Sequence, residues 1–331
     1  MPFMYDFHLA DVASFVLRRK ARLVALQLPE GLIAQARAMV EELEKSTGAR
    51  FLVLADPCYG ACDVNLQYKE YSDALVHFGH SEMPSLQTDE GVMFVEVTAD
   101  CHVLELVPEA AKRLCDRVGL VTTVQHIDKL ETVRAALERE GKQVFVGRGD
   151  GRIKHPGQVL GCNVSAASSL AERVDCYLYI GSGDFHPLAV SLGTGKPVIV
   201  LDPFIRQIRD VDELKDRILR QRYGAIVRAA EARSYGILVS SKPGQKRLAL
   251  AQELRAKLDS KGKKVVILVA NNIDPDRLAS YGLDAFVSTA CPRLAIDDYM
   301  RYKQPILTPK ELEIVLGERK WEDYVFDSIS V

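Results

Sequence analysis

The sequence has no excess of basic residues, no long apolar run and no closely spaced cysteine pair. Its 331 residues carry 43 Lys and Arg against 45 Asp and Glu, which argues against a nucleic-acid surface. No apolar run approaches the roughly 20 residues that a membrane helix needs, and the first residues lack the basic-then-apolar order of a signal peptide. The absence of a C-x₂-C pair argues against a zinc ribbon or a thioredoxin-like motif.

Two glycine-rich segments resemble nucleotide-binding motifs, but both are incomplete. Residues 193–197, Gly-Thr-Gly-Lys-Pro, have proline where a P-loop requires Ser or Thr after the lysine. Residues 147–151, Gly-Arg-Gly-Asp-Gly, lack the third glycine of a dinucleotide fingerprint, because Arg152 occupies its position. We interpret both segments as turns.

The overall composition is that of a soluble globular protein, with 47% apolar and 27% charged residues. The length allows two or three domains of ordinary size. Seven cysteines in a chain without an export signal favour thiols or metal ligands over disulfides. We therefore expect a cytoplasmic protein in a reducing compartment.

The chain repeats one β-α-β plan three times, and this is its strongest structural signal. The third strand of each repeat reads DALVHF, DCYLYI and DAFVST, at residues 73–78, 175–180 and 284–289. Such an order requires mostly parallel strands with right-handed crossovers. The predicted fold is α/β, with three similar domains, each a small mostly parallel sheet flanked by helices, arranged around a pseudo-threefold axis. The predicted domains are residues 1–107, 108–210 and 211–331, with charged, helix-prone linkers near residues 108–117 and 204–233.

Three cysteines lie in small-residue loops that follow predicted strands. Cys58 and Cys162 follow second strands of their repeats, and Cys291 follows a third strand. Ligands collect beyond the carboxyl ends of parallel strands, so three such loops around one axis can converge. Three thiolates suit an iron–sulfur cluster with one iron left without a protein ligand. The alternative is that these cysteines are small buried hydrophobic residues.

The other cysteines carry weaker signals. Cys62 is ambiguous, because it lies four residues from Cys58 and could begin a helix on the same side, but we interpret it as a bystander. We interpret Cys101, Cys115 and Cys176 as structural residues.

Several polar residues also follow predicted strands, on the side where the cysteines lie. The candidates for cofactor binding are Glu30, His80, Gln125 and Gln245. An ordinary capping role at the following helix explains each position equally well. No catalytic side chain beyond the cluster ligands is predicted.

Four runs of sequence resemble those of a known family. They are DPCYGACD at residues 56–63, FGHS at 78–81, GQVLGC at 157–162 and STACPRLAID at 288–297. Together they resemble the diphthamide-synthesis radical enzymes, in particular the single-subunit archaeal branch. The resemblance covers nearly the whole chain. It implies a homodimer in which three related domains each give one cysteine, here Cys58, Cys162 and Cys291, to a [4Fe–4S] cluster.

The resemblance also implies an activity. Members of that family cleave the Cγ–S bond of S-adenosylmethionine with an electron from an external donor and release methylthioadenosine. The 3-amino-3-carboxypropyl group is transferred as a radical to C2 of a histidine imidazole in translation elongation factor 2. Two other interpretations stay open at this point: a Lewis-acid cluster enzyme similar to quinolinate synthases, and a non-catalytic iron–sulfur protein.

The C-terminal segment is rich in aromatic residues, with Trp321, Tyr324, Val325 and Phe326 close together. It is too short to bury these side chains on itself. We expect it to dock on a domain of the same chain or on a partner subunit.

Overall fold

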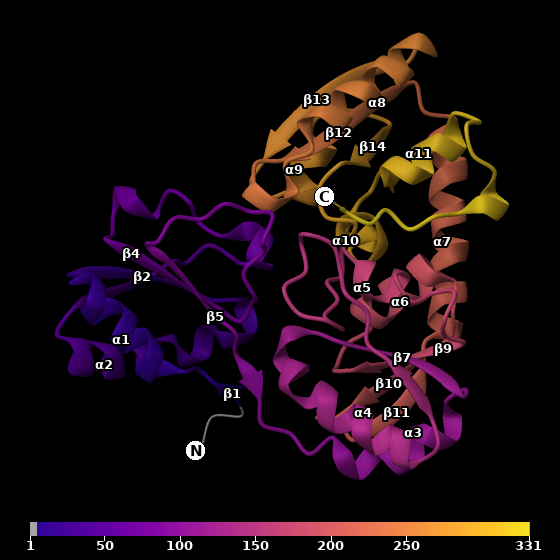
Figure 1. The fold of residues 1–331 in the computed structure, drawn as a ribbon. Coiled ribbons are helices and arrows are strands. Elements are labelled where there is room, and N and C mark those ends of the chain that lie inside the picture. Colours follow the sequence, from indigo (N-terminus) through magenta and orange to yellow (C-terminus); the bar gives the residue numbers. More distant parts are fainter. Residues whose placement is uncertain (1–4, 331) are drawn as a thin grey trace.

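The structure is a computed structural model that describes residues 5–330. Three larger sheets, each flanked by helices, follow one another along the chain (Figure 1). The first has the order β3-β2-β4-β5 and is parallel throughout. Its strands are β2 (Leu23–Gln27), β3 (Arg50–Val53), β4 (Ala74–Phe78) and β5 (Val92–Val95). Helices α1 (Leu9–Arg19) and α2 (Ala36–Thr47) pack on one face.

The residues of β2 alternate between the two faces of this sheet, as a strand requires. Val24 and Leu26 pack with the two helices, whereas Ala25 packs with Tyr68 on the other face. Both faces are therefore covered, which explains why the strands read as continuous apolar runs.

The second sheet has the order β11-β10-β9-β7-β8, in which only β11 runs antiparallel. Its strands are β7 (Arg117–Thr122), β8 (Gln143–Phe145), β9 (Cys176–Ile180), β10 (Val198–Asp202) and β11 (Gln207–Asp210). Helices α3 (Val107–Arg113) and α4 (Leu130–Arg139) pack on one face. The other face carries α5 (Ser165–Ser168), α6 (Phe185–Thr194) and the first part of α7 (Asp212–Ala230).

The third sheet has the order β13-β12-β14-β15 and is parallel. Its strands are β12 (Ser234–Ser240), β13 (Lys264–Ala270), β14 (Ala285–Ser288) and β15 (Ile306–Leu307). Helices α8 (Leu248–Ser260) and α11 (Pro309–Val315), with the last part of α7, form one layer. Helices α9 (Pro275–Ala279) and α10 (Arg293–Ile296) lie on the other face.

The smaller elements connect these units. Strands β1 (Tyr5–Asp6) and β6 (Thr98–Ala99) form an antiparallel pair. The 3₁₀ turns are η1 (Glu30–Gln35), η2 (Ala61–Asp63), η3 (Tyr68–Glu70), η4 (Leu104–Leu106), η5 (Val124–Lys129), η6 (Pro243–Gln245), η7 (Tyr299–Arg301) and η8 (Trp321–Asp323).

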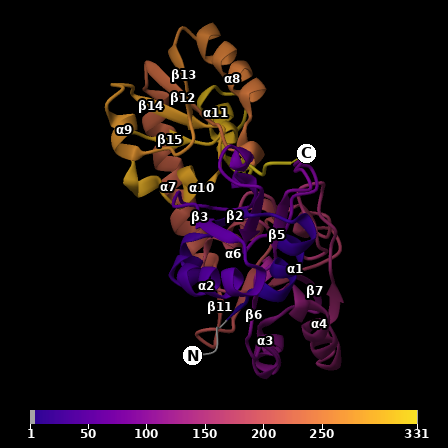
Figure 2. The same ribbon diagram turned by 90° about the vertical axis from the view of Figure 1, so that its left-hand side faces the viewer.

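The long helix α7 joins the second unit to the third along one side of the molecule (Figure 1). Its Ile218 packs in the second core and its Ala225 and Ile226 in the third. Figure 2 shows the first unit in front of the second, with the third above them. The C-terminal segment returns to the region between the second and third units (Figure 1).

The predicted α/β class with mostly parallel, helix-flanked sheets is confirmed. The pseudo-threefold axis and the domain limits stay predictions. One detail differs from expectation: the helix-prone linker at residues 204–233 also contains β11. In residues 5–330, no helix combines the length and apolar character needed to cross a membrane.

The sequence favours thiols or metal ligands over disulfides, and this expectation is wrong for one pair of cysteines. Cys115 and Cys176 are joined, with their Cα atoms 6.0 Å apart and a separation of 61 positions in sequence. Cys176 begins β9, beside Val118 of β7, and Cys115 lies just before β7. The sheet therefore brings together two thiols that the sequence separates. The link closes a long loop and restricts the unfolded chain.

The aromatic C-terminal segment packs within the chain. Phe326 is 3% exposed in the core of the second unit. Trp321 packs against the third core, and the Tyr324 hydroxyl donates to a carboxylate oxygen of Glu311 at 3.1 Å. Docking on the same chain, one of the two expected outcomes, is therefore what the structure contains for the three aromatic residues, whereas Val325 is exposed.

Candidate functional site

Cys62 lies on η2, in the loop that follows β3. The turn is held by the third unit, because Gln245 of η6 donates its Nε2 hydrogen to Cys62 Sγ at 3.2 Å. Next to it, the buried carboxylate of Asp63 pairs with the buried ammonium of Lys242. Burial, and then the charge of Cys162, raises the pKa of Cys62 to about 12.

Cys162 lies in the long loop after β8 and is buried. Leu160, two residues earlier, packs in the same small cluster as Cys62. The Arg152 guanidinium reaches Cys162 Sγ with Nη2 at 4.0 Å. Burial raises the pKa of Cys162, while the Arg152 charge acts in the opposite direction. Arg152 is 7% exposed, and its Nε has no hydrogen-bond partner among the described residues.

Cys291 lies between β14 and α10, separated from the helix by Pro292. Its loop is held by Arg247, whose guanidinium donates to the carbonyls of Thr289 at 2.6 Å and Ala290 at 3.1 Å. Burial, then the charges of Cys162 and Cys62, raises the pKa of Cys291. Cys162 thus raises the pKa of both Cys62 and Cys291, and Cys62 raises that of Cys291, so the three thiols are close enough to interact electrostatically although each comes from a different sheet unit.

Cys58 has different neighbours. It lies beside Pro29 in an isolated parallel bridge, and its Sγ is 3.9 Å from His77 Nε2. Cys58, His77 and His80 form a compact group whose ligand atoms all lie within 4.8 Å of one another. The electrostatic effects thus join Cys62, rather than Cys58, to Cys162 and Cys291, while the ligand set of Cys58, Cys162 and Cys291 stays a prediction.

The group around Cys58 is a hydrogen-bonded network. His77 Nδ1 lies 2.9 Å from Gln27 Oε1, which can only accept, so this nitrogen carries the hydrogen. His77 Nε2 therefore accepts from His80 Nδ1 at 3.0 Å. Burial, then the charge of His80, lowers the pKa of His77, and burial, then the charge of His186, lowers that of His80 to about 4. Both imidazoles are neutral near pH 7.

The four residues predicted to bind a cofactor lie in different surroundings, and their role stays a prediction. Gln245 contacts Cys62 directly. His80 belongs to the network around Cys58, and Gln125 donates to the Gly79 carbonyl at 2.8 Å, which ties the second unit to the first beside His80. Glu30 is exposed at the start of η1 and is not among the residues gathered around the three thiols.

Sequence reasoning missed three cations and undervalued Cys62. Arg152 was noted only for breaking a glycine motif, while Lys242 and Arg247 flank Gln245 in one short segment. Clustering of cations near a predicted cysteine site was the signal that could have identified them. Their charges would compensate those of several thiolates.

The donor set fits an iron–sulfur cluster. Thiolates are the protein ligands of such clusters, and three of them leave one iron open. The ligands of a cluster bind different irons. Their ligand atoms can therefore lie farther apart than those of Cys58, His77 and His80, which are all within 4.8 Å of one another. The unpaired Nε of Arg152 also suits an anionic group at this place. The fold and site thus define a class: α/β proteins of three sheet units with a common thiol site at the strand ends.

Comparison with known proteins identifies the family. A family model described as putative diphthamide synthesis protein matches residues 28–325. The chain is 38% identical to the 2-(3-amino-3-carboxypropyl)histidine synthase of Pyrococcus horikoshii, over 98% of this chain and 94% of the relative. It is 31% identical to subunit 1 of the synthase of Caenorhabditis elegans, over 96% and 81% of the two chains. The chain belongs to the diphthamide synthesis protein family.

A solved structure supports the same assignment. The crystal structure of Dph2 from Pyrococcus horikoshii with a 4Fe-4S cluster matches with a TM-score of 0.90 and 36% identity, over 98% of this chain and 94% of that one. The expected resemblance is thereby confirmed. The relatives are named as synthases, so the expectation of a transferase is confirmed at the level of the family.

The close approach of η6 to Cys62 gives a first prediction. A methyl group on Gly244 would lie 2.6 Å from both Cα and Cβ of Cys62, so the two loops would have to separate. We expect Gly244→Ala to destabilise the protein by about 1–3 kcal/mol and to reduce its uptake of iron. Denaturant unfolding and iron analysis after anaerobic reconstitution measure the two effects.

Gly224 provides the matched control. It lies within α7, and a methyl group there would have nothing within 4 Å. Gly224→Ala should leave iron uptake unchanged and raise helix stability by up to about 1 kcal/mol. Equal behaviour of the two variants would contradict the role given to the Gly244 contact.

Proposed function

We propose that this protein transfers the 3-amino-3-carboxypropyl group of S-adenosylmethionine to C2 of a histidine imidazole in translation elongation factor 2. The observation that carries the proposal is the gathering of Cys62, Cys162 and Cys291 from three sheet units. The relatives named as 2-(3-amino-3-carboxypropyl)histidine synthases supply the product class. Methylthioadenosine is the expected second product.

Cys62, Cys162 and Cys291 would hold a [4Fe–4S] cluster, the group with which the structural neighbour was crystallised. When bound, such a cluster would supply the electron that breaks the Cγ–S bond of the sulfonium, and an external donor would replace that electron. Each thiol has its own support from this chain. Gln245 donates to Cys62, Arg152 lies against Cys162, and Arg247 holds the loop of Cys291.

The residues around the thiols suit an amino-acid co-substrate. Arg152 has a free Nε donor, and Lys242 lies over the ring of Tyr59 at 4.8 Å while it pairs with Asp63. We propose that Arg152 orients the co-substrate carboxylate, because a guanidinium recognises that group through paired N–H donors. Gln125 and His80, joined through the Gly79 region, would line the same side, and exposed Glu30 is the weakest of these candidates.

The test of the proposed transfer uses the protein substrate. Reconstituted protein, a reductant, S-adenosylmethionine and elongation factor 2 are incubated anaerobically, and the factor is digested and analysed by mass spectrometry. One histidine should gain a single 3-amino-3-carboxypropyl group. A factor in which that histidine is replaced should gain nothing. No mass increase under conditions that consume S-adenosylmethionine would contradict the proposed acceptor.

We also propose that the chain acts as a homodimer. Light scattering at micromolar concentration should give about twice the 36.8 kDa of one chain. Phe326 is buried within the chain, so the interface does not depend on that side chain. A mass equal to that of one chain would contradict the dimer without affecting the proposed chemistry.

A further inference from the structure

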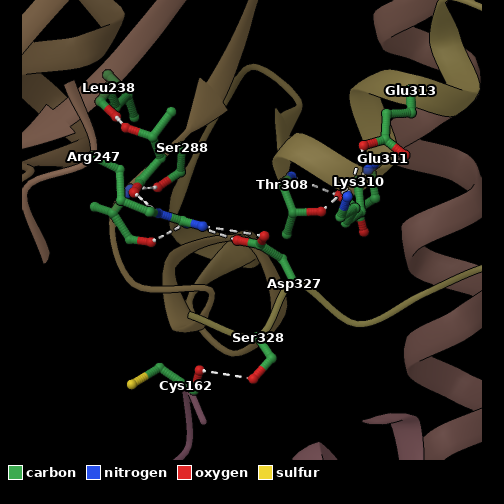
Figure 3. Close-up of polar contacts among 12 residues, drawn as sticks. Cys162, Leu238, Arg247, Ser288, Thr308, Lys310, Glu311, Glu313, Asp327 and Ser328 are labelled. Carbon is green, nitrogen blue, oxygen red and sulfur yellow. Dashed lines mark hydrogen bonds and ion pairs between the residues drawn. The ribbon is translucent and has the colours of Figure 1, made fainter. Parts of the chain in front are cut away.

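The end of the chain connects two of the cysteine loops. We call residues 327–329 the C-terminal strap. On one side, the Ile329 amide donates to the Cys162 carbonyl at 2.7 Å, and the Asn163 side chain donates to the Ile329 carbonyl at 2.9 Å. The Ser328 hydroxyl also lies 3.5 Å from the Cys162 carbonyl (Figure 3). The strap therefore pairs with the backbone of the Cys162 loop.

On its other side, the strap contacts the residue that holds the Cys291 loop. Asp327 accepts from Arg247 through both carboxylate oxygens, at 2.7 and 3.2 Å. The same guanidinium donates to the carbonyls of Thr289 and Ala290, the two residues before Cys291. Figure 3 shows Arg247 pointing at Asp327, with Ser328 turned toward Cys162. One short segment thus links the second and third units beside two of the three thiols.

Burial distinguishes this strap from an ordinary chain end. The last residues of a domain are usually poorly ordered unless they are tied down. Here Asp327 is 3% exposed, Ile329 is 5% exposed, and the preceding Phe326 is buried in the core of the second unit. A buried carboxylate is stable only if it is paired, so Asp327 depends on Arg247 and Arg247 on Asp327.

We propose that the C-terminal strap fixes the Cys162 and Cys291 loops relative to each other, and that Asp327 is its positioning residue. The inference rests on the proposed cluster. The strap would hold two cluster ligands, which come from different units, at the spacing that one cluster requires. Groups that orient metal ligands commonly change metal affinity by 10–100-fold when they are removed. The strap would thus make a stable site depend on correct docking of the end of the third unit.

Asp327→Asn tests the proposal with little change in shape, and removal of residues 327–331 tests the whole strap. In the protein without cluster, alkylation of Cys162 and Cys291 should become about tenfold faster, the ratio expected for the loss of one charge-assisted hydrogen bond. Alkylation of Cys58, which lies in the first unit, should not change. Peptide mass spectrometry reports the three rates separately.

A second readout uses the reconstituted protein. Asp327→Asn should release iron to a chelator roughly tenfold faster or more, and its reduced form should give a changed electron paramagnetic resonance spectrum. The matched control is Glu318→Gln, which removes an exposed ion pair of 2.6 Å with Lys257 in the same unit. This variant should behave as the wild type in every readout.

The outcomes separate the strap from the proposed function. Unchanged alkylation of Cys162 and Cys291 in both strap variants would overturn the proposal, as would unchanged iron release and an unchanged spectrum. If the wild-type protein took up no cluster, the proposed function would fail. The alkylation rates would still decide whether the strap orders the two loops.

Discussion

Replacement of Cys62 by alanine should abolish the iron–sulfur cluster, whereas replacement of Cys58 should leave it in place. The reason is geometric: Cys62 shares one region with Cys162 and Cys291, and Cys58 lies against His77 instead. A cluster with one thiolate missing loses a covalent ligand, so iron and sulfide content after anaerobic reconstitution should fall by most of its wild-type value. Cys162→Ala and Cys291→Ala should give the same loss.

The remaining cysteines supply the controls. Cys101 packs against the core between α3, α4 and the second sheet, 3.5 Å from His126 Nδ1, and Cys115 is joined to Cys176. Alanine at position 101, or serine at both 115 and 176, should leave the iron content unchanged. A Cys58→Ala variant that loses the cluster, together with a Cys62→Ala variant that keeps it, would restore the ligand set predicted from sequence.

The second large effect concerns the stability of the third unit. Arg222 of α7 and Glu311 of α11 are both fully buried, and the guanidinium forms hydrogen bonds of 2.8 and 2.7 Å with the carboxylate. Glu311 also accepts from the Thr308 amide at 2.8 Å at the start of α11 (Figure 3). Glu311→Ala would leave the Arg222 charge buried without its partner. We expect a loss of about 3–5 kcal/mol in the free energy of unfolding, measured by urea denaturation.

Two variants show whether charge or volume causes this loss. The double change Arg222→Met with Glu311→Leu removes both charges and keeps most of the volume, so it should recover much of the lost stability. Glu318→Gln, which removes an exposed ion pair, should change the free energy by less than about 1 kcal/mol. A Glu311→Ala variant that unfolds within 1 kcal/mol of wild type would contradict the account of this pair.

The strand order could be predicted because it is encoded locally. The runs at residues 73–78, 175–180 and 284–289 contain the third strands β4, β9 and β14, each ended by the residues that follow it. Strand β11 was not predicted, because three of its four residues, Gln207–Asp210, are polar and it forms a half-exposed antiparallel edge. The periodicity of apolar residues and the residue composition give little indication of such a strand.

The choice between Cys58 and Cys62 could not be made from sequence. Both lie in the same loop, four residues apart, and the deciding contacts come from the third unit: the Gln245 amide and the close approach of Gly244. These residues are more than 180 positions away in the chain, at a separation of 183 for Gln245. The Cys115–Cys176 link and the C-terminal strap escaped prediction for the same reason, since tertiary packing alone brings their members together.

The central claim is that the site gathered by Cys62, Cys162 and Cys291 cleaves S-adenosylmethionine at its Cγ–S bond. The most direct test is to incubate the reduced, reconstituted protein anaerobically with S-adenosylmethionine and to identify the released nucleoside by liquid chromatography and mass spectrometry. The account predicts methylthioadenosine from the wild type and from Cys58→Ala, and none from Cys62→Ala. Release of 5′-deoxyadenosine as the main product, or of no nucleoside from protein that carries its full cluster, would contradict it.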